Sequence, residues 1–151
     1  YLHRDGRFAS ACPALHGKLL GALRAQPALY MSPQVALRVR SIEFHSYAAG
    51  DGLMTVGHRD QGSVLTMSVL LSSPDDFRGG TFMTCDRADA GERGERRVVD
   101  GHHVLHPIAR GDAILFHSEK MHNVMPLTEG VRHALVIELW LGSTNVLDRH
   151  S

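Results

Sequence analysis

The alternation of apolar and polar positions divides the chain into a short helical part and a longer part built of strands. Residues 13–29 place apolar side chains at helical spacing, and Pro27 is positioned to end the helix. The apolar positions of this expected helix are Leu15, Leu19, Ala22 and Leu23. From Val35 onward, short apolar runs alternate with turn residues, which is typical of strands.

Eight segments have the composition of strands: residues 35–47, 53–58, 63–71, 80–84, 97–108, 112–117, 121–127 and 131–141. Turn-forming residues separate several of them, at 48–52, 72–76, 110–112 and 128–130. So many short strands without helices between them favour an antiparallel sandwich or small barrel, with a jelly roll as the leading candidate. Residues 64–71 and 134–141 are apolar nearly throughout rather than alternating, so we expect both faces to be covered, one of them by the N-terminal helix.

The length and charge of the chain bear on its number of domains and on its partners. The 151 residues predict one domain, 1–151, in which residues 1–34 form a helical support and residues 35–141 the jelly-roll core. Sixteen basic and 16 acidic residues balance, so no overall field favours nucleic acid or an anionic membrane. No apolar run approaches the roughly 20 residues that cross a bilayer. The chain begins at Tyr1 rather than Met, so any targeting segment is expected outside it, and the compartment is left open.

Histidine is unusually abundant, with 11 residues, and one tripeptide suggests a metal site. In an extended strand, residues i and i+2 point to the same face, so His58 and Asp60 would converge while Arg59 points away. A second histidine from another strand would complete two imidazoles and one carboxylate on one face of an octahedron, which suits Fe(II) oxygenases. Alone, the tripeptide is weak evidence.

A downstream segment strengthens the hypothesis. His117 and His122 are both candidates for the second histidine, and Arg132 opens an otherwise apolar strand. A guanidinium does not deprotonate, so its burial nearly demands a carboxylate partner. Arg132 either reaches solvent or a protein carboxylate from the strand end, or it binds the far carboxylate of a dicarboxylic acid.

Five motifs occur in a characteristic order along the chain. They are Tyr47-Ala-Ala-Gly50, His58-Arg-Asp60, Gly79-Gly80-Thr-Phe, Gly111-Asp112-Ala-Ile-Leu-Phe, and His122 followed ten residues later by Arg132. With this set the chain resembles the prolyl 4-hydroxylase-like branch of the 2-oxoglutarate/Fe(II) oxygenases, from about Val39 to Trp140.

The resemblance implies a double-stranded β-helix, which agrees with the jelly roll expected from the strands. It also implies that His58, Asp60 and His122 bind Fe(II), and the ten-residue spacing to Arg132 favours His122 over His117. Arg132 matches the residue that binds the C5 carboxylate of 2-oxoglutarate, with Tyr47 and Thr66 beside it. O2 is the expected co-substrate and ascorbate a candidate reductant. The chain departs from the family pattern in its longer Gly50–His58 interval and in Leu53, where many members have a second tyrosine.

The implied activity is hydroxylation of a C–H bond with release of succinate and CO2. The expected substrate is a peptidyl prolyl side chain, or a lysyl side chain next. The alternatives are a dioxygenase of a small metabolite and, from another class, a non-catalytic jelly-roll binding module. A carboxylate at Asp60 favours hydroxylation over halogenation, because related halogenating enzymes have a small residue there.

Other features have ordinary structural explanations. Gly79-Gly80 and Gly111-Asp112 are typical of turns, and the charged stretch 86–96 is typical of a surface loop. His102, His103 and His106 suggest an accessory metal site less strongly than they suggest surface histidines.

Overall fold

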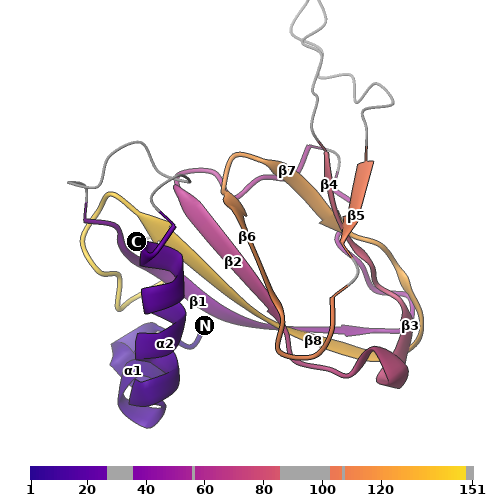
Figure 1. Cartoon of the computed structure of the whole chain (residues 1–151), viewed down its shortest axis with the longest axis horizontal. Coiled ribbons are helices and arrows are strands. Elements are labelled where there is room, and N and C mark those ends of the chain that lie inside the picture. The colour runs from indigo at the N-terminus through magenta and orange to yellow at the C-terminus, as the bar shows by residue number, and fades with distance from the viewer. Residues whose placement is uncertain (27–35, 56, 86–102, 107, 149–151) are drawn as a thin grey trace, which may run out of the picture.

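Two antiparallel sheets form the body of the protein, and two short helices precede them (Figure 1). The computed structural model describes residues 1–26, 36–55, 57–85, 103–106 and 108–148. The helical elements are η1 (Arg4–Gly6), α1 (Arg7–Ala11), α2 (Pro13–Arg24) and η3 (Pro74–Asp76). The strands are β1 (Arg38–Ala48), β2 (Leu65–Leu70), β3 (Phe77–Gly79), β4 (Phe82–Cys85), β5 (His103–His106), β6 (Ala113–His117), β7 (Met121–Val124) and β8 (Leu127–Trp140).

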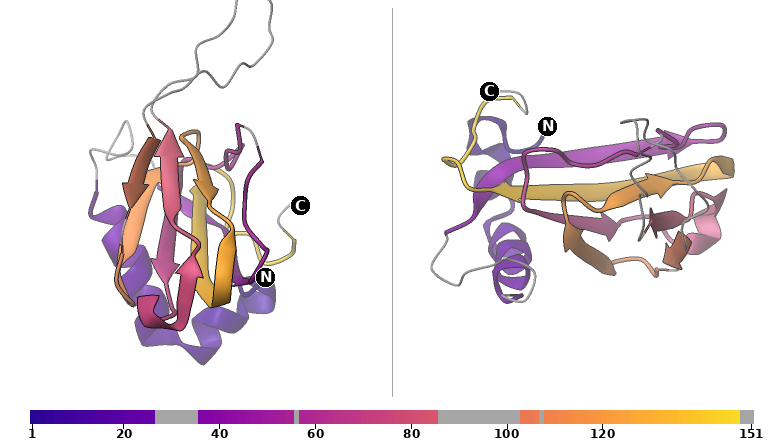
Figure 2. Two further views of the ribbon diagram at one scale, coloured as in Figure 1. Left: turned by 90° about the vertical axis from the view of Figure 1, so that its right-hand side faces the viewer. Right: turned by 90° about the horizontal axis from the view of Figure 1, so that it is seen from above.

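The order of the strands is that of a double-stranded β-helix, as expected from the sequence. The larger sheet has the order β1-β8-β2-β6, with β3 added to the end of β8, and the smaller sheet has the order β5-β4-β7. Figure 2 shows the long strands β1 and β8 side by side, with the shorter strands to one side of them. Strands that are distant in sequence are therefore neighbours in each sheet, and the two sheets enclose one interior.

Helix α2 packs on the outer face of the larger sheet. Its Leu20 and Leu23 are buried against alternate residues of the strands, such as Ile42 of β1 and Met67 of β2. Every residue of β2 is buried, because the helix covers one of its faces and the interior covers the other. The prediction that this apolar strand is covered on both sides is confirmed.

The interior between the sheets combines an aromatic wall with a row of polar residues. Phe82, Phe116 and Val124 form a small buried cluster. The side chains of the larger sheet that alternate with its outer core residues face this interior, among them Thr66 of β2 and Arg132 of β8. This polar row contains the candidate site.

The strand predicted at residues 53–58 is absent. Leu53 makes a single β-bridge with Val124, and the chain then turns at Gly57, whose φ of 71° is incompatible with an extended strand. Val56 lies outside the described residues. The segment is a loop held against β7.

The turn predicted at residues 128–130 is also wrong, because β8 runs through it from Leu127 to Trp140. Gly130 has a φ of 74° within this strand, and a Cβ there would overlap the carbonyl oxygen of Asp76. The glycine therefore allows the close approach of β3, a short strand that the sequence pattern did not predict.

The expected helix is shorter in the structure, and one expected strand is described only in part. Helix α2 ends at Arg24 rather than near residue 29, and Leu15 is exposed rather than packed. Of the predicted strand 97–108, residues 103–106 form β5, while 97–102 lie outside the described residues, as do loop 86–96 and residues 27–35. Among the described residues, no helix has the length and apolar character needed to span a membrane.

Candidate metal and co-substrate site

Backbone hydrogen bonds fix the loop that contains His58 and Asp60. The His122 amide donates to the His58 carbonyl at 3.2 Å, and the Asp60 amide donates to the Ser118 carbonyl at 2.9 Å. The Leu53–Val124 bridge holds the start of the same loop. His58 and Asp60 do face one another, as the i, i+2 spacing predicts. However, they lie in a loop that is hydrogen-bonded to β7 and not in a strand.

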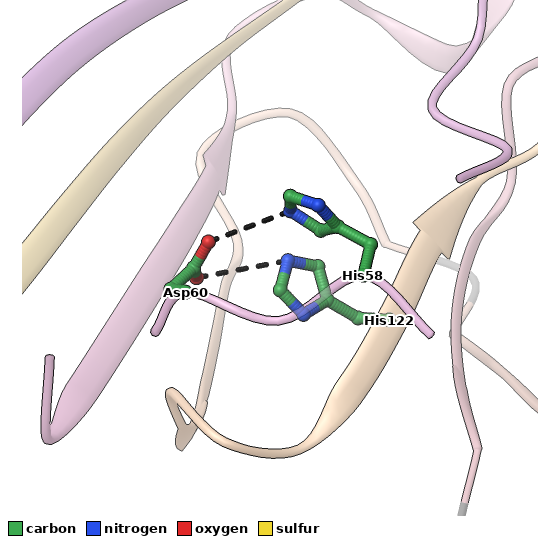
Figure 3. Close-up of side chains that lie close together, drawn as sticks. All are labelled: His58, Asp60 and His122. Carbon is green, nitrogen blue, oxygen red and sulfur yellow. Dashed lines mark ion pairs between the residues drawn. The ribbon is translucent and has the colours of Figure 1, made fainter. Parts of the chain in front are cut away.

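Three side chains converge at this point: His58, Asp60 and His122 (Figure 3). The Asp60 carboxylate lies between the imidazoles, with Oδ1 3.5 Å from His58 Nε2 and Oδ2 3.6 Å from His122 Nε2. All three ligand atoms lie within 4.8 Å of one another. Ligand bonds of about 2.1 Å at right angles would place neighbouring donors about 3 Å apart, so small side-chain rotations suffice to close the site on one ion.

The orientation of His122 suits metal binding. Its Nδ1 lies 3.0 Å from the carbonyl oxygen of Lys120, which can only accept, so Nδ1 carries the proton. The lone pair of a neutral ring then lies on Nε2, the atom that faces Asp60. Ring contacts with Phe116, at 4.7 Å between centroids, and with Phe82, at 5.7 Å, hold the imidazole in place. A hydrogen bond from the distal nitrogen is the usual way in which proteins orient a metal-binding histidine.

Asp60 is buried and is supported by hydroxyl groups. The Thr66 hydroxyl donates to Asp60 Oδ2 at 2.7 Å and also lies 2.9 Å from the Ser118 hydroxyl. Burial by itself raises the pKa of Asp60, but the hydrogen bond from His58, the nearby His122 and the Thr66 hydroxyl outweigh it and lower the pKa. The group is therefore a carboxylate at neutral pH, as a metal ligand must be.

A buried arginine lies in the same cavity. Arg132 is only 2% exposed, and in the described part of the chain no carboxylate pairs with it. It lies opposite Tyr47 in the register of β1 and β8, with its Cζ 5.8 Å from the centre of the tyrosine ring. Burial lowers the pKa of Arg132 and Tyr47 opposes that effect, but a guanidinium stays charged in proteins. A buried cation that faces a cavity and pairs with none of the described carboxylates fits a carboxylate ligand.

The three expected metal ligands and the three expected co-substrate residues line one cavity of about 180 Å³. The structure places the Thr66 hydroxyl on Asp60, so its contact with the co-substrate stays a prediction. His117 is exposed on β6 and lies outside the group formed by His58, Asp60 and His122.

Several residues of the site escaped prediction. The Ser118 carbonyl accepts the Asp60 amide, and its hydroxyl is hydrogen-bonded to Thr66, yet it follows a strand without any distinctive sequence pattern. Glu43 and His45 line the cavity from β1, where their alternation with Tyr47 could have indicated a shared face.

The amino-acid sequence is similar to those of PKHD-type hydroxylases. The chain is 30% identical over 146 residues to a PKHD-type hydroxylase of Caulobacter sp. (strain K31), covering 88% of the chain and 56% of that protein. It is 27% identical over 139 residues to a PKHD-type hydroxylase of Delftia acidovorans, covering 83% of the chain and 54% of the relative. The chain thus spans about half the length of the relatives it matches. No family model matches it.

Solved structures share the fold. An oxidoreductase of the 2OG-Fe(II) oxygenase family from Burkholderia pseudomallei superposes with a TM-score of 0.59 at 14% identity, over 90% of this chain and 59% of that one. A Trichoplax adhaerens prolyl hydroxylase, solved with a peptide fragment of hypoxia inducible factor, gives a TM-score of 0.59 at 17% identity, over 91% and 59%.

Fold and site together define a class of protein, namely a double-stranded β-helix with two histidines, one carboxylate and a buried arginine in one cavity. The resemblance inferred from the sequence is confirmed. The chain is similar in sequence to PKHD-type hydroxylases, and it has the fold of the prolyl 4-hydroxylase-like 2-oxoglutarate/Fe(II) oxygenases.

Proposed function

We propose that the chain is an Fe(II)- and 2-oxoglutarate-dependent dioxygenase domain that hydroxylates a C–H bond. One observation carries the proposal: the His58–Asp60–His122 group and the buried Arg132 line the same cavity. The donor set fits Fe(II), because two neutral imidazoles and one carboxylate leave a divalent ion with net positive charge and open positions. Such an ion favours a dianionic co-substrate.

Each residue has a separate role in this proposal. His58, Asp60 and His122 would hold the iron, while Arg132 and Tyr47 would bind the C5 carboxylate of 2-oxoglutarate. When bound, iron and 2-oxoglutarate supply the oxidising chemistry, with O2 consumed and succinate and CO2 released. The protein orients the co-substrate between Arg132 and the metal ligands, and Phe82, Phe116 and Val124 exclude water from one wall of the cavity.

The carboxylate of Asp60 supports hydroxylation over halogenation, since it occupies the position that a halide would need. The Thr66 hydroxyl keeps this carboxylate turned toward both imidazoles. Its lowered pKa keeps it ionised in the working range of pH.

For the substrate we propose a peptidyl prolyl side chain first and a lysyl side chain next. Two observations support a peptide. The relatives are named PKHD-type hydroxylases, and one structural neighbour is a prolyl hydroxylase solved with a peptide fragment. A small metabolite remains the alternative, to be decided by assay.

The test is succinate release with Fe(II), 2-oxoglutarate and ascorbate, screened over proline peptides, lysine peptides and small metabolites. We expect release to be stimulated by a proline peptide and abolished in Asp60→Ala. His117→Ala is the matched control, because this exposed histidine lies outside the metal group and should leave turnover unchanged. Full turnover in Asp60→Ala would refute the metal assignment. Stimulation by metabolites alone would replace the peptide substrate.

A further inference from the structure

The inner face of β1 has three polar side chains in a hydrogen-bonded row. Glu43, His45 and Tyr47 alternate along the strand, so all three face the cavity. His45 Nε2 lies 3.0 Å from Glu43 Oε2, and His45 Nδ1 lies 3.2 Å from the Tyr47 hydroxyl. The row thus leads from a carboxylate to Tyr47, whose ring centre lies 5.8 Å from Arg132 Cζ.

The chemistry of this row limits where the Tyr47 proton can point. An ionised carboxylate only accepts hydrogen bonds, so His45 donates to Glu43 through an Nε2 proton. A neutral imidazole has only that one proton, which makes Nδ1 an acceptor. Tyr47 must then donate its hydroxyl proton to His45. In this state the phenol offers a lone pair, not a proton, to any carboxylate at Arg132.

A second proton on His45 reverses this arrangement. An imidazolium donates from both nitrogens, to Glu43 through Nε2 and to the phenol oxygen through Nδ1. The Tyr47 proton is then free to point into the cavity. The charge of the imidazolium is balanced by Glu43 at 3.0 Å.

We propose that His45, held by Glu43, is a positioning residue for 2-oxoglutarate: in its protonated form it directs the Tyr47 hydroxyl proton to the C5 carboxylate. This inference rests on the proposed function, because it needs a carboxylate at Arg132. Tyr47 remains a proton donor because burial raises its pKa, with Glu43 and Asp60 acting in the same direction and Arg132 opposing them.

Other charged groups also face this cavity and must be separated from His45. They are Arg132 and Glu138 from β8, His58 and Asp60 from the loop before β2, and His122 from β7. Protonation of the metal ligands affects co-substrate binding in any variant that keeps them. The contribution of His45 is therefore the part of the pH dependence that disappears when the Tyr47 hydroxyl is removed.

The experiment measures the dissociation constant of 2-oxoglutarate by calorimetry on the Fe(II)-loaded chain without oxygen, from about pH 6 to about pH 8, where histidine titrates. For the wild type we expect weaker binding as pH rises, by about tenfold between the two limits, the equivalent of one hydrogen bond to a charged group. Calorimetry in buffers of different ionisation heat should show proton uptake on binding. Tyr47→Phe should bind 2-oxoglutarate more weakly than wild type at low pH. It should also lack the His45 contribution to the pH dependence of binding and to the proton uptake.

His45→Gln is the matched variant. Its amide can donate to the Tyr47 oxygen without titrating, so we expect tight binding at low pH that persists at high pH.

The outcomes separate the two proposals. If wild type binds 2-oxoglutarate but Tyr47→Phe has the same pH profile and proton uptake, the positioning role of His45 is wrong and the proposed function stands. If the metal-loaded wild type does not bind 2-oxoglutarate at any pH, the proposed function fails and this inference fails with it.

Discussion

Replacing Arg132 by methionine should change stability and co-substrate binding in opposite directions. Arg132 is 2% exposed, and no carboxylate among the described residues pairs with its guanidinium, so within this part of the chain the buried charge is not neutralised by an ion pair. Methionine keeps much of the apolar stem, which packs beside Gly80, but removes the charge. A buried cation without a partner is costly, and apolar replacements of buried charges are often neutral or stabilising.

The expected magnitudes follow from this burial. Removing the charge should stabilise the ligand-free fold by on the order of 1 kcal/mol, which for a domain of this size raises the melting temperature by roughly 2–4 °C. Truncating one partner of a buried, hydrogen-bonded charge pair costs about 2–5 kcal/mol. The affinity for 2-oxoglutarate should therefore fall by at least about 30-fold.

The assay is thermal unfolding with and without 2-oxoglutarate, together with calorimetric titration of the co-substrate into metal-loaded protein. Arg132→Lys is the control, since it keeps a charge but loses the planar fork that matches a carboxylate. Its affinity should lie between those of wild type and Arg132→Met. A methionine variant that melts lower and binds 2-oxoglutarate as well as wild type would show that the arginine is structural.

Three further changes test the metal group and its surroundings. Thr66→Val removes a hydrogen bond to Asp60, so iron affinity should fall about 10- to 100-fold in a metal titration; a change in 2-oxoglutarate affinity alone would instead support the co-substrate role. Burial raises the Asp60 pKa, but the histidines and Thr66 lower it below its ordinary value, so the carboxylate stabilises the metal-free fold above the unfolded pKa of about 3.9. This stability is lost as pH falls through the lower, folded pKa. The free energy of unfolding of Asp60→Asn should therefore fall less in acid than that of the wild type, and an equal fall in both proteins would contradict the lowered pKa. In Gly80→Ala the new methyl would lie 2.8 Å from Leu127 Cδ1 and 3.1 Å from Arg132 Cδ, so both side chains must shift and 2-oxoglutarate binding should weaken. In Gly111→Ala, with φ of 90° and open space, only stability should fall, by roughly 1 kcal/mol.

The sequence predicted those features that depend on local pattern. The nearly continuous apolar run 64–71 predicted a strand covered on both faces, which is β2. The ordered motifs led to His58, Asp60 and His122 as one group. The spacing between His122 and Arg132 resolved the choice between two histidines because it reflects the passage from one sheet to the other.

Features that depend on tertiary contacts could not be predicted. Gly130 is typical of a turn, but it lies within β8 because β3 approaches too closely for a side chain. The strand predicted at 53–58 is not formed because Leu53 makes only a single bridge to β7, and the chain turns at Gly57. The support of Asp60 by Ser118 joins residues 58 positions apart, and no local pattern encodes such a contact.

The central claim is that one cavity holds both the metal and 2-oxoglutarate. The most direct test is a crystal structure of the chain with Mn(II) in place of iron and with 2-oxoglutarate bound. We predict that the metal lies on the Nε2 atoms of His58 and His122 and on the Asp60 carboxylate, with the C5 carboxylate of 2-oxoglutarate at Arg132. A metal bound elsewhere, or a co-substrate that does not contact Arg132, would contradict the account.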